Sequence, residues 1–257
     1  MEIVLTIAGS DPSGGAGIQQ DLRTIESLGC YGASVITALT TQNTLGVQSV
    51  MPVPADVVRS QLEAVLSDLD VKAIKIGQIP SADVAHAIAE TLSHHLTPIT
   101  HHPIILDPVM ISTSGRRLMS EDAIDVVVSE LFPLCTLITP NIPEMETLSG
   151  LSGFNACNYN ILIKGGHAEG SEMADRLCLT NGTERVYATE KINSTNLHGT
   201  GCALSSAIAS SLALGYSLED AVARGKDYVT EAIRRGKDLG IGHGNGPVFY
   251  KRIDNNE

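Results

Sequence analysis

Short apolar runs recur along the chain and alternate with stretches in which apolar residues have helical spacing. Because these runs lack the apolar-polar alternation of a half-exposed strand, they are typical of strands buried on both faces. Helical spacing appears in residues 58–69 and again in 218–236. The pattern therefore predicts a parallel sheet with helices on both sides. The apolar runs lie at Ile36 and at residues 3–7, 74–76, 104–106, 137–138 and 161–163.

Three further features complete the expected order of elements. Ser217 precedes the helix at 218–236, and we expect it to form a capping box with Asp220. Residues 202–214 are small and apolar but contain four serines, which indicates a packed core helix and not a membrane span. A helix over 143–149 is needed to connect two neighbouring parallel strands. No linker, repeat or low-complexity segment is visible, so we expect residues 1–257 to form a single domain.

The charge and the cysteine content limit the possible partners and compartments. The net charge is −12 and the pI is about 5.0, so neither nucleic acid nor an anionic membrane surface is expected as a partner. Five cysteines without a C-x-x-C pair suit a reducing compartment, and the acidic start Met1-Glu2 is unlike a signal peptide. We therefore expect a cytoplasmic protein. The histidine pairs at 94–95 and 101–102 lack metal-ligand spacing with a carboxylate or thiol.

Residues 198–202, with the sequence His-Gly-Thr-Gly-Cys, directly precede the expected core helix. The two glycines around Thr200 leave backbone N–H groups exposed at a helix start, where the helix dipole is positive. This arrangement predicts an anion site. A thiol at such a helix start has a lowered pKa, so we expect the pKa of Cys202 to be lowered. The alternative interpretation is a glycine-rich loop before a buried helix.

A second glycine-rich segment, residues 9–17, follows the first buried strand. It is not a Walker A loop, because Gly15 stands where the phosphate-binding lysine is required. It is not a dinucleotide fingerprint either, because Gln20 occupies the position of the third glycine. The segment therefore serves another ligand or forms only a tight turn.

Polar residues whose side chains could take part in binding or catalysis follow several of the predicted strands. Asp107, Asn141, Lys164 and the loop at Gly9 each come directly after a buried strand. In an open α/β sheet, ligands bind beyond the carboxyl ends of the strands, so these residues can converge on one cleft. Each also has a simpler explanation: a turn at Asp107, a helix cap at Asn141 with Glu144 in its first turn, and a surface hairpin at Lys164. Only the shared placement favours a common site.

Six ordered motifs resemble the hydroxymethylpyrimidine/phosphomethylpyrimidine kinases of thiamin biosynthesis, which belong to the ribokinase-like superfamily. The motifs are AGSDPSGGAGIQQDL, TALTTQNTLGV, ILDPVM, TPNIPEME, ILIKGGH and HGTGCALSSAIA. The resemblance covers nearly the whole chain and implies a ribokinase-like three-layer α/β/α sandwich with a mostly parallel central sheet. It also implies an ATP- and Mg²⁺-dependent kinase that phosphorylates 4-amino-5-hydroxymethyl-2-methylpyrimidine and then its monophosphate. A homodimer is a further implication.

The resemblance assigns roles to individual residues, and their chemistry suits those roles. For the pyrimidine it implies Gln42, Asp21, Gly9 and Ala16. For ATP it implies Lys164, Asp107, Thr200 and His167, and for the metal Asn141, Glu144 and Asp107. For catalysis it implies an anion hole at Gly199, Thr200 and Gly201, with Cys202 as proton acceptor in the first transfer. Without the resemblance, Asp21 would be interpreted as a solvated helix acid.

The sequence departs from the family pattern at two places, and alternative functions stay open. Gln78 replaces an apolar residue, often Met, of the pyrimidine pocket, and residues 149–160 are shorter than the helical segment of the family. A pyridoxal or pyridoxine kinase is the nearest alternative, because related enzymes with the same Gly-Thr-Gly-Cys run accept that ring. A hydroxyethylthiazole kinase fits less well, because residues 9–17 do not resemble that family. The non-enzymatic alternative is a pyrimidine-binding regulatory domain.

Overall fold

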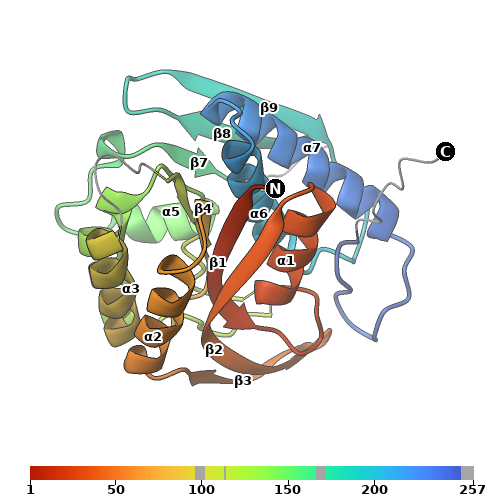
Figure 1. Cartoon of the computed structure of the whole chain (residues 1–257). Helices are drawn as coiled ribbons and strands as arrows, with labels where there is room; N and C mark the ends of the chain where they lie inside the picture. Colours follow the sequence, from red (N-terminus) through yellow and green to blue (C-terminus); the bar gives the residue numbers. More distant parts are fainter. Residues whose placement is uncertain (96–101, 113, 166–171, 250–257) are drawn as a thin grey trace.

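The computed structural model describes residues 1–95, 102–112, 114–165 and 172–249. Among these residues, nine strands form one sheet in the order β3-β2-β1-β4-β5-β6-β7-β8-β9 (Figure 1). The six strands from β2 to β7 in this order pair in parallel, whereas β2–β3, β7–β8 and β8–β9 pair in antiparallel fashion. The predicted, mostly parallel central sheet is confirmed.

The predicted apolar runs all lie in the parallel strands. These strands are β1 (Ile3–Ser10), β2 (Tyr31–Asn43), β4 (Val71–Ile76), β5 (Ile104–Leu106), β6 (Leu137–Ile138) and β7 (Ile161–Ile163). The antiparallel strands at the two edges of the sheet are β3 (Gly46–Pro52), β8 (Glu172–Cys178) and β9 (Glu184–Glu190). The apolar pattern did not reveal these edge strands, because β3 and β9 have largely exposed side chains and no continuous apolar run.

Two layers of helices cover the sheet, and each layer has its own hydrophobic core. On one face lie α2 (Ala55–Leu66), α3 (Ala82–His95), α4 (Glu121–Val126) and α5 (Ile142–Ser149). On the other face lie α1 (Gly17–Ser27), α6 (Thr200–Ala213) and α7 (Leu218–Gly236). A π-helical turn spans Val127–Leu131, and 3-10 turns span Phe132–Leu134 and Ala156–Asn158. The three-layer α/β/α sandwich is confirmed (Figure 1). No helix within the described residues is long and apolar enough to cross a membrane.

The helix ends differ from expectation at one position. The Ser217 hydroxyl accepts a hydrogen bond from the Asp220 backbone N–H at 3.2 Å, as expected for an N-cap. The Asp220 carboxylate, however, accepts from the Ser217 hydroxyl at 2.7 Å and not from the Ser217 backbone, so the predicted capping box is only half formed. The complete capping box lies at the start of α5, between Asn141 and Glu144. The helix expected over 143–149 is confirmed as α5.

A buried ion pair joins four elements in the middle of the molecule. The Lys75 ammonium on β4 lies 2.7 Å from the Asp21 carboxylate on α1, and both side chains are fully buried. Asp21 also accepts hydrogen bonds from the hydroxyls of Thr6 on β1, at 2.7 Å, and Ser206 on α6, at 2.8 Å. Although burial disfavours the charged form, Asp21 raises the pKa of Lys75 above its usual value. Asp21 is therefore neither a solvated helix acid nor exposed to a ligand.

We expect this ion pair to be a strong determinant of stability. Asp21→Asn keeps the shape of the side chain but leaves the Lys75 ammonium buried without its counter-charge. Breaking a buried pair in this way lowers the free energy of unfolding by about 3 to 5 kcal/mol, which urea denaturation measures. The double variant Asp21→Asn/Lys75→Met should recover at least half of the loss. A fully additive loss in the double variant would contradict the pairing.

Candidate active site

Two adjoining cavities lie at the carboxyl ends of the parallel strands. The smaller has a volume of about 230 Å³ and the larger about 930 Å³. The smaller cavity is lined by the loop at Gly9 and by Asp107, Asn141 and Lys164, so the predicted convergence of strand ends is confirmed. The two cavities share a boundary of mostly polar and small residues. The shared residues are Ile111, Ser112, Asn141, Glu144, Lys164, Thr200 and Gly201.

The N-terminus of α6 forms this boundary. Gly199 is the N-cap residue with φ of 84°, and a Cβ atom there would lie 1.9 Å from the Gly15 carbonyl oxygen. A Cβ atom on Gly201 would lie 3.1 Å from a carboxylate oxygen of Asp107. The two glycines therefore allow the helix start to approach both the first loop and the Asp107 carboxylate. The backbone N–H groups of a free helix start suit an anion.

Cys202 lies in the first turn of α6, with its sulfur between two helix starts. The backbone N–H of Gly17, the first residue of α1, donates a hydrogen bond to this sulfur. Burial nevertheless raises the pKa of Cys202 to about 11, and the nearby Lys75 only partly opposes this effect. The predicted lowering of the thiol pKa is therefore wrong. The desolvation of the thiolate outweighs the helix dipole and the ammonium together, so the thiol is protonated at neutral pH.

Asp107 and Lys164 form an ion pair that faces the smaller cavity. The Lys164 ammonium lies 2.5 Å from Asp107, whose side chain is 2% exposed. Burial opposes the charge on Lys164, but Asp107 and Glu144 raise its pKa above the usual value. The interpretation of Lys164 as part of a surface hairpin is insufficient. The residue does directly follow β7 in the connection to β8, but its side chain lines the cavity. This ammonium is placed to neutralise a phosphate at the boundary of the two cavities.

Asn141 and Glu144 serve two purposes at the start of α5. Each side chain accepts from the other residue's backbone N–H at 2.8 Å, so the helix-cap interpretation is correct. Both residues also line the two cavities. Burial raises the pKa of Glu144 to about 7, with a smaller contribution in the same direction from the Asp107 charge. A cation beside the two carboxylates would relieve this unfavourable burial of negative charge.

The donor set fits Mg²⁺ better than a metal held by protein ligands alone. No group of three or more His, Cys, Asp or Glu side chains that could hold a metal occurs in the part of the chain that the structure describes. Mg²⁺ commonly binds one or two carboxylates and completes its shell with water and phosphate oxygens. Asp107 and Glu144 would supply those carboxylates.

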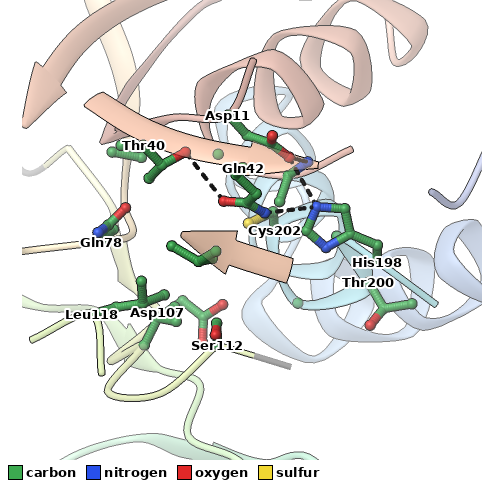
Figure 2. A pocket seen from close by; sticks show the side chains of 18 of the residues that line it. Asp11, Thr40, Gln42, Gln78, Asp107, Ser112, Leu118, His198, Thr200 and Cys202 are labelled. Carbon is green, nitrogen blue, oxygen red and sulfur yellow. Dashed lines mark hydrogen bonds and ion pairs between the residues drawn. The ribbon is translucent and has the colours of Figure 1, made fainter. Parts of the chain in front are cut away.

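Gln42, Gly9 and Ala16 line the smaller cavity, as the resemblance implies, but Asp21 does not. The Gln42 amide lies within hydrogen-bond distance of the His198 ring and of the Thr40 hydroxyl, and His198 contacts Asp11 at 2.8 Å (Figure 2). A Cβ atom on Gly9 would lie 2.1 Å from the Gln78 amide oxygen, so Gly9 makes room for Gln78 beside the cavity. His167, which the resemblance implies for ATP, lies outside the described residues.

The sequence interpretation missed three ionisable residues that line the smaller cavity, namely Asp11, Lys75 and His198. Lys75 had a detectable signal, because a lysine inside a strand that is buried on both faces requires a counter-charge. It was overlooked because residues 74–76 were treated as one apolar run. His198 and Asp11 lie within the quoted motifs, but their contact joins residues 187 positions apart and has no local signal.

Comparisons with known proteins agree with this geometry. The sequence model of the phosphomethylpyrimidine kinase family matches residues 11–249. The hydroxymethylpyrimidine/phosphomethylpyrimidine kinase of Rhizobium meliloti is 43% identical over 262 residues, which cover 96% of each chain. Among solved structures, phosphomethylpyrimidine kinase from Clostridium difficile is 41% identical with a TM-score of 0.75, and covers 91% of this chain and 100% of its own. An ADP complex of Bacillus subtilis pyridoxal kinase is 29% identical with a TM-score of 0.85, and both chains are fully covered.

These similarities extend over the elements that build the two cavities. The matched region contains the Asp107–Lys164 pair, the start of α5 and the start of α6. The layers and the parallel sheet are those of the ribokinase-like α/β fold. Because a family model matches most of the chain and a relative above 40% identity spans nearly all of it, this chain belongs to the phosphomethylpyrimidine kinase family.

Proposed function

We propose that this protein transfers the terminal phosphoryl group of ATP to 4-amino-5-hydroxymethyl-2-methylpyrimidine and then to the resulting monophosphate. The observation that carries the proposal is the boundary between the two cavities, where Lys164, Thr200 and Gly201 line both. The larger cavity takes the nucleotide and the smaller one takes the pyrimidine. The names of the relatives support this acceptor, and the ADP complex of the pyridoxal kinase supports a nucleotide in this fold.

The residues at the boundary stabilise the negative charge of the phosphates, as phosphoryl transfer requires. The backbone N–H groups at the start of α6 donate to the transferring group, and Lys164 neutralises the nucleotide phosphates. Asp107 and Glu144, with Asn141 fixing Glu144, hold Mg²⁺, which shields the phosphate charge when it is bound. Gln42 pairs with the edge of the pyrimidine, because its amide offers both a donor and an acceptor.

Cys202 has a different role in each transfer. An alcohol acceptor loses a proton, and the Cys202 sulfur at the start of α6 takes it up when it is ionised. A monophosphate acceptor already carries negative oxygens and needs no base. The homodimer implied by the resemblance belongs to the same proposal, as do the single domain over 1–257 and the cytoplasmic location expected from the sequence composition. Light scattering tests the homodimer.

Pyridoxal is a second candidate acceptor, and one observation favours it. The Gln78 amide nitrogen is buried and has no hydrogen-bond partner among the described residues, although its side chain lines the smaller cavity (Figure 2). The phenolic oxygen of pyridoxal, which the aminopyrimidine lacks, would satisfy this donor. Pyridoxal kinases are also similar to this chain at about 30% identity.

An ADP-release assay with each acceptor tests the proposed function. We expect turnover with the hydroxymethyl pyrimidine and with its monophosphate, both dependent on Mg²⁺. Mass spectrometry of the products identifies the monophosphate and the diphosphate. Turnover with pyridoxal but with neither pyrimidine would overturn the proposal in favour of the second candidate.

Replacing Cys202 should separate the two transfers. Near pH 10, where the thiol begins to ionise because its pKa is about 11, Cys202→Ala should slow phosphorylation of the alcohol by about 100 to 10,000-fold, the range expected for the loss of a general base. Transfer to the monophosphate should suffer much less, because the N–H donors at the start of α6 are unchanged. Single-turnover rates at saturating ATP measure both steps without product release. Cys157→Ala, at an exposed thiol, is the control and should change neither rate.

The high pKa of Cys202 also predicts a pH dependence. Because the thiolate is the active base, kcat/KM for the alcohol should rise about tenfold per pH unit between about pH 7 and pH 10, towards the pKa of about 11. The same profile for Cys202→Ala should lack this rise. Equal profiles for the native protein and the variant would show that the thiol does not act as a base.

Removing the Glu144 charge should weaken the binding of Mg²⁺ specifically. Glu144→Gln retains a side chain that can complete the capping box but cannot ionise. The Mg²⁺ concentration for half-maximal rate should rise by about 10 to 100-fold, while the melting temperature changes little. Glu146→Gln, at an exposed position of the same helix, is the matched control. An unchanged Mg²⁺ dependence in Glu144→Gln would remove Glu144 from the proposed site.

A further inference from the structure

The Asp11 carboxylate has a dense set of hydrogen-bond donors around it. One oxygen accepts from the backbone N–H and the hydroxyl of Ser13, at 2.8 and 2.7 Å. The other accepts from the backbone N–H groups of Gly15 and Ala16, at 3.2 and 2.9 Å. Burial opposes ionisation, but the hydrogen bonds from His198 and Ser13 lower the pKa of Asp11 below its usual value. Asp11 is therefore an ionised group that only accepts hydrogen bonds.

This carboxylate determines which atom of His198 carries a proton. The Nε2 atom of His198 lies 2.8 Å from the carboxylate oxygen of Asp11. A ring nitrogen at this distance from an ionised oxygen must donate, because two lone pairs would repel each other. The ring is held in place by its contact with Gly15 and by the hydrogen bonds of the His198 backbone to Gly246 and Val248. Nε2 therefore carries a hydrogen, whatever the state of the other ring nitrogen.

The same Nε2 atom lies 3.0 Å from the amide of Gln42, and the atom that faces it in Figure 2 is the amide nitrogen. Two N–H groups cannot form a hydrogen bond with each other. A half-turn of the amide places its oxygen at this position, where it shares the hydrogen of Nε2 with Asp11. The contact on the His198 side therefore requires an amide oxygen.

The contacts at the other end of the Gln42 amide indicate the same orientation independently. The Thr40 hydroxyl lies 3.0 Å from the Ser10 carbonyl oxygen and 3.2 Å from the Gln42 amide oxygen drawn in Figure 2. Its single hydrogen can serve both oxygens only as a weaker, bifurcated hydrogen bond. After the half-turn, the Gln42 amide nitrogen donates to the Thr40 hydroxyl, which donates to Ser10. One rotation thus removes both conflicts.

We infer that Asp11 and His198 are positioning residues that fix the Gln42 amide with its oxygen towards His198 and its NH₂ group towards Thr40. The next step rests on the proposed function. In this orientation the amide binds a ligand edge that has a hydrogen-bond donor on the His198 side and an acceptor on the Thr40 side. An aminopyrimidine presents that pattern through its exocyclic amine and the adjacent ring nitrogen. The analogue with a carbonyl oxygen in place of the amine presents the reverse pattern and is rejected.

The orientation is directly observable in the native protein without any ligand. Neutron diffraction from deuterated crystals distinguishes the ND₂ group from the oxygen of the amide. We expect deuterium on the Gln42 nitrogen beside Thr40 and on Nε2 of His198. Deuterium on the Gln42 atom that faces His198 would overturn the inference, even if the protein phosphorylates the pyrimidine.

Selectivity provides the second test. Calorimetry without ATP gives the dissociation constants of the aminopyrimidine and of the carbonyl analogue. The double variant His198→Phe/Thr40→Val releases both ends of the amide, and the native preference for the aminopyrimidine should fall at least tenfold. Each single variant keeps one of the two contacts of the amide, so its preference for the aminopyrimidine should lie between those of the native protein and the double variant. His86→Phe, at a half-exposed histidine paired with Glu130 on the surface, is the control and should keep the native preference.

The outcomes separate the inference from the proposed function. An unchanged preference in the double variant would overturn the inference. A native protein that binds neither pyrimidine would instead overturn the proposed function, and the neutron result alone would then decide the orientation of Gln42.

Discussion

The site depends on the close approach of two helix starts to the loop that follows β1. A Cβ atom on Gly17, whose φ is +57°, would lie 2.2 Å from the Gly9 carbonyl oxygen, and Gly199 is equally confined against Gly15. Without these glycines, α1 and α6 could not begin next to the same strand end. Their approach brings the backbone N–H of Gly17 to the Cys202 sulfur and the start of α6 to Asp107. The ligand cavities are thus a consequence of backbone contacts that larger residues would prevent.

An acidic protein that handles phosphates has to hold its positive groups at defined positions, and this chain does so with lysines that are largely shielded from solvent. Three of the four lysines that line the cavities are paired with a carboxylate: Lys75 with Asp21, Lys164 with Asp107, and Lys226 with Asp175. Asp175 also accepts from the backbone N–H of Gly165, the residue after Lys164. Because each carboxylate anchors its lysine to the fold, the ammonium groups are held in position before an anion arrives.

The sequence was sufficient for the central sheet and for the residues at its strand ends, because continuous apolar runs and the polar residues after them are local signals. It was insufficient where a property depends on distant partners. The burial of Asp21 is set by Lys75 and Ser206, which are 54 and 185 positions away. The pKa of Cys202 was predicted in the wrong direction because a helix start is visible in a sequence and the degree of burial is not. For Asn141 and Glu144 the two alternative interpretations are both correct. The same residues cap α5 and line the cavities.

The protonated thiol of Cys202 has a consequence for a site that serves two acceptors, if the proposed function holds. At neutral pH a carboxylate in this position would be ionised and would repel a monophosphate, whereas a thiol with a pKa of about 11 is neutral. The first acceptor, an alcohol, needs a base only late in the reaction, because a loose transition state requires little proton transfer beforehand. The burial that makes Cys202 a poor resident base therefore makes the same cavity compatible with an anionic second acceptor.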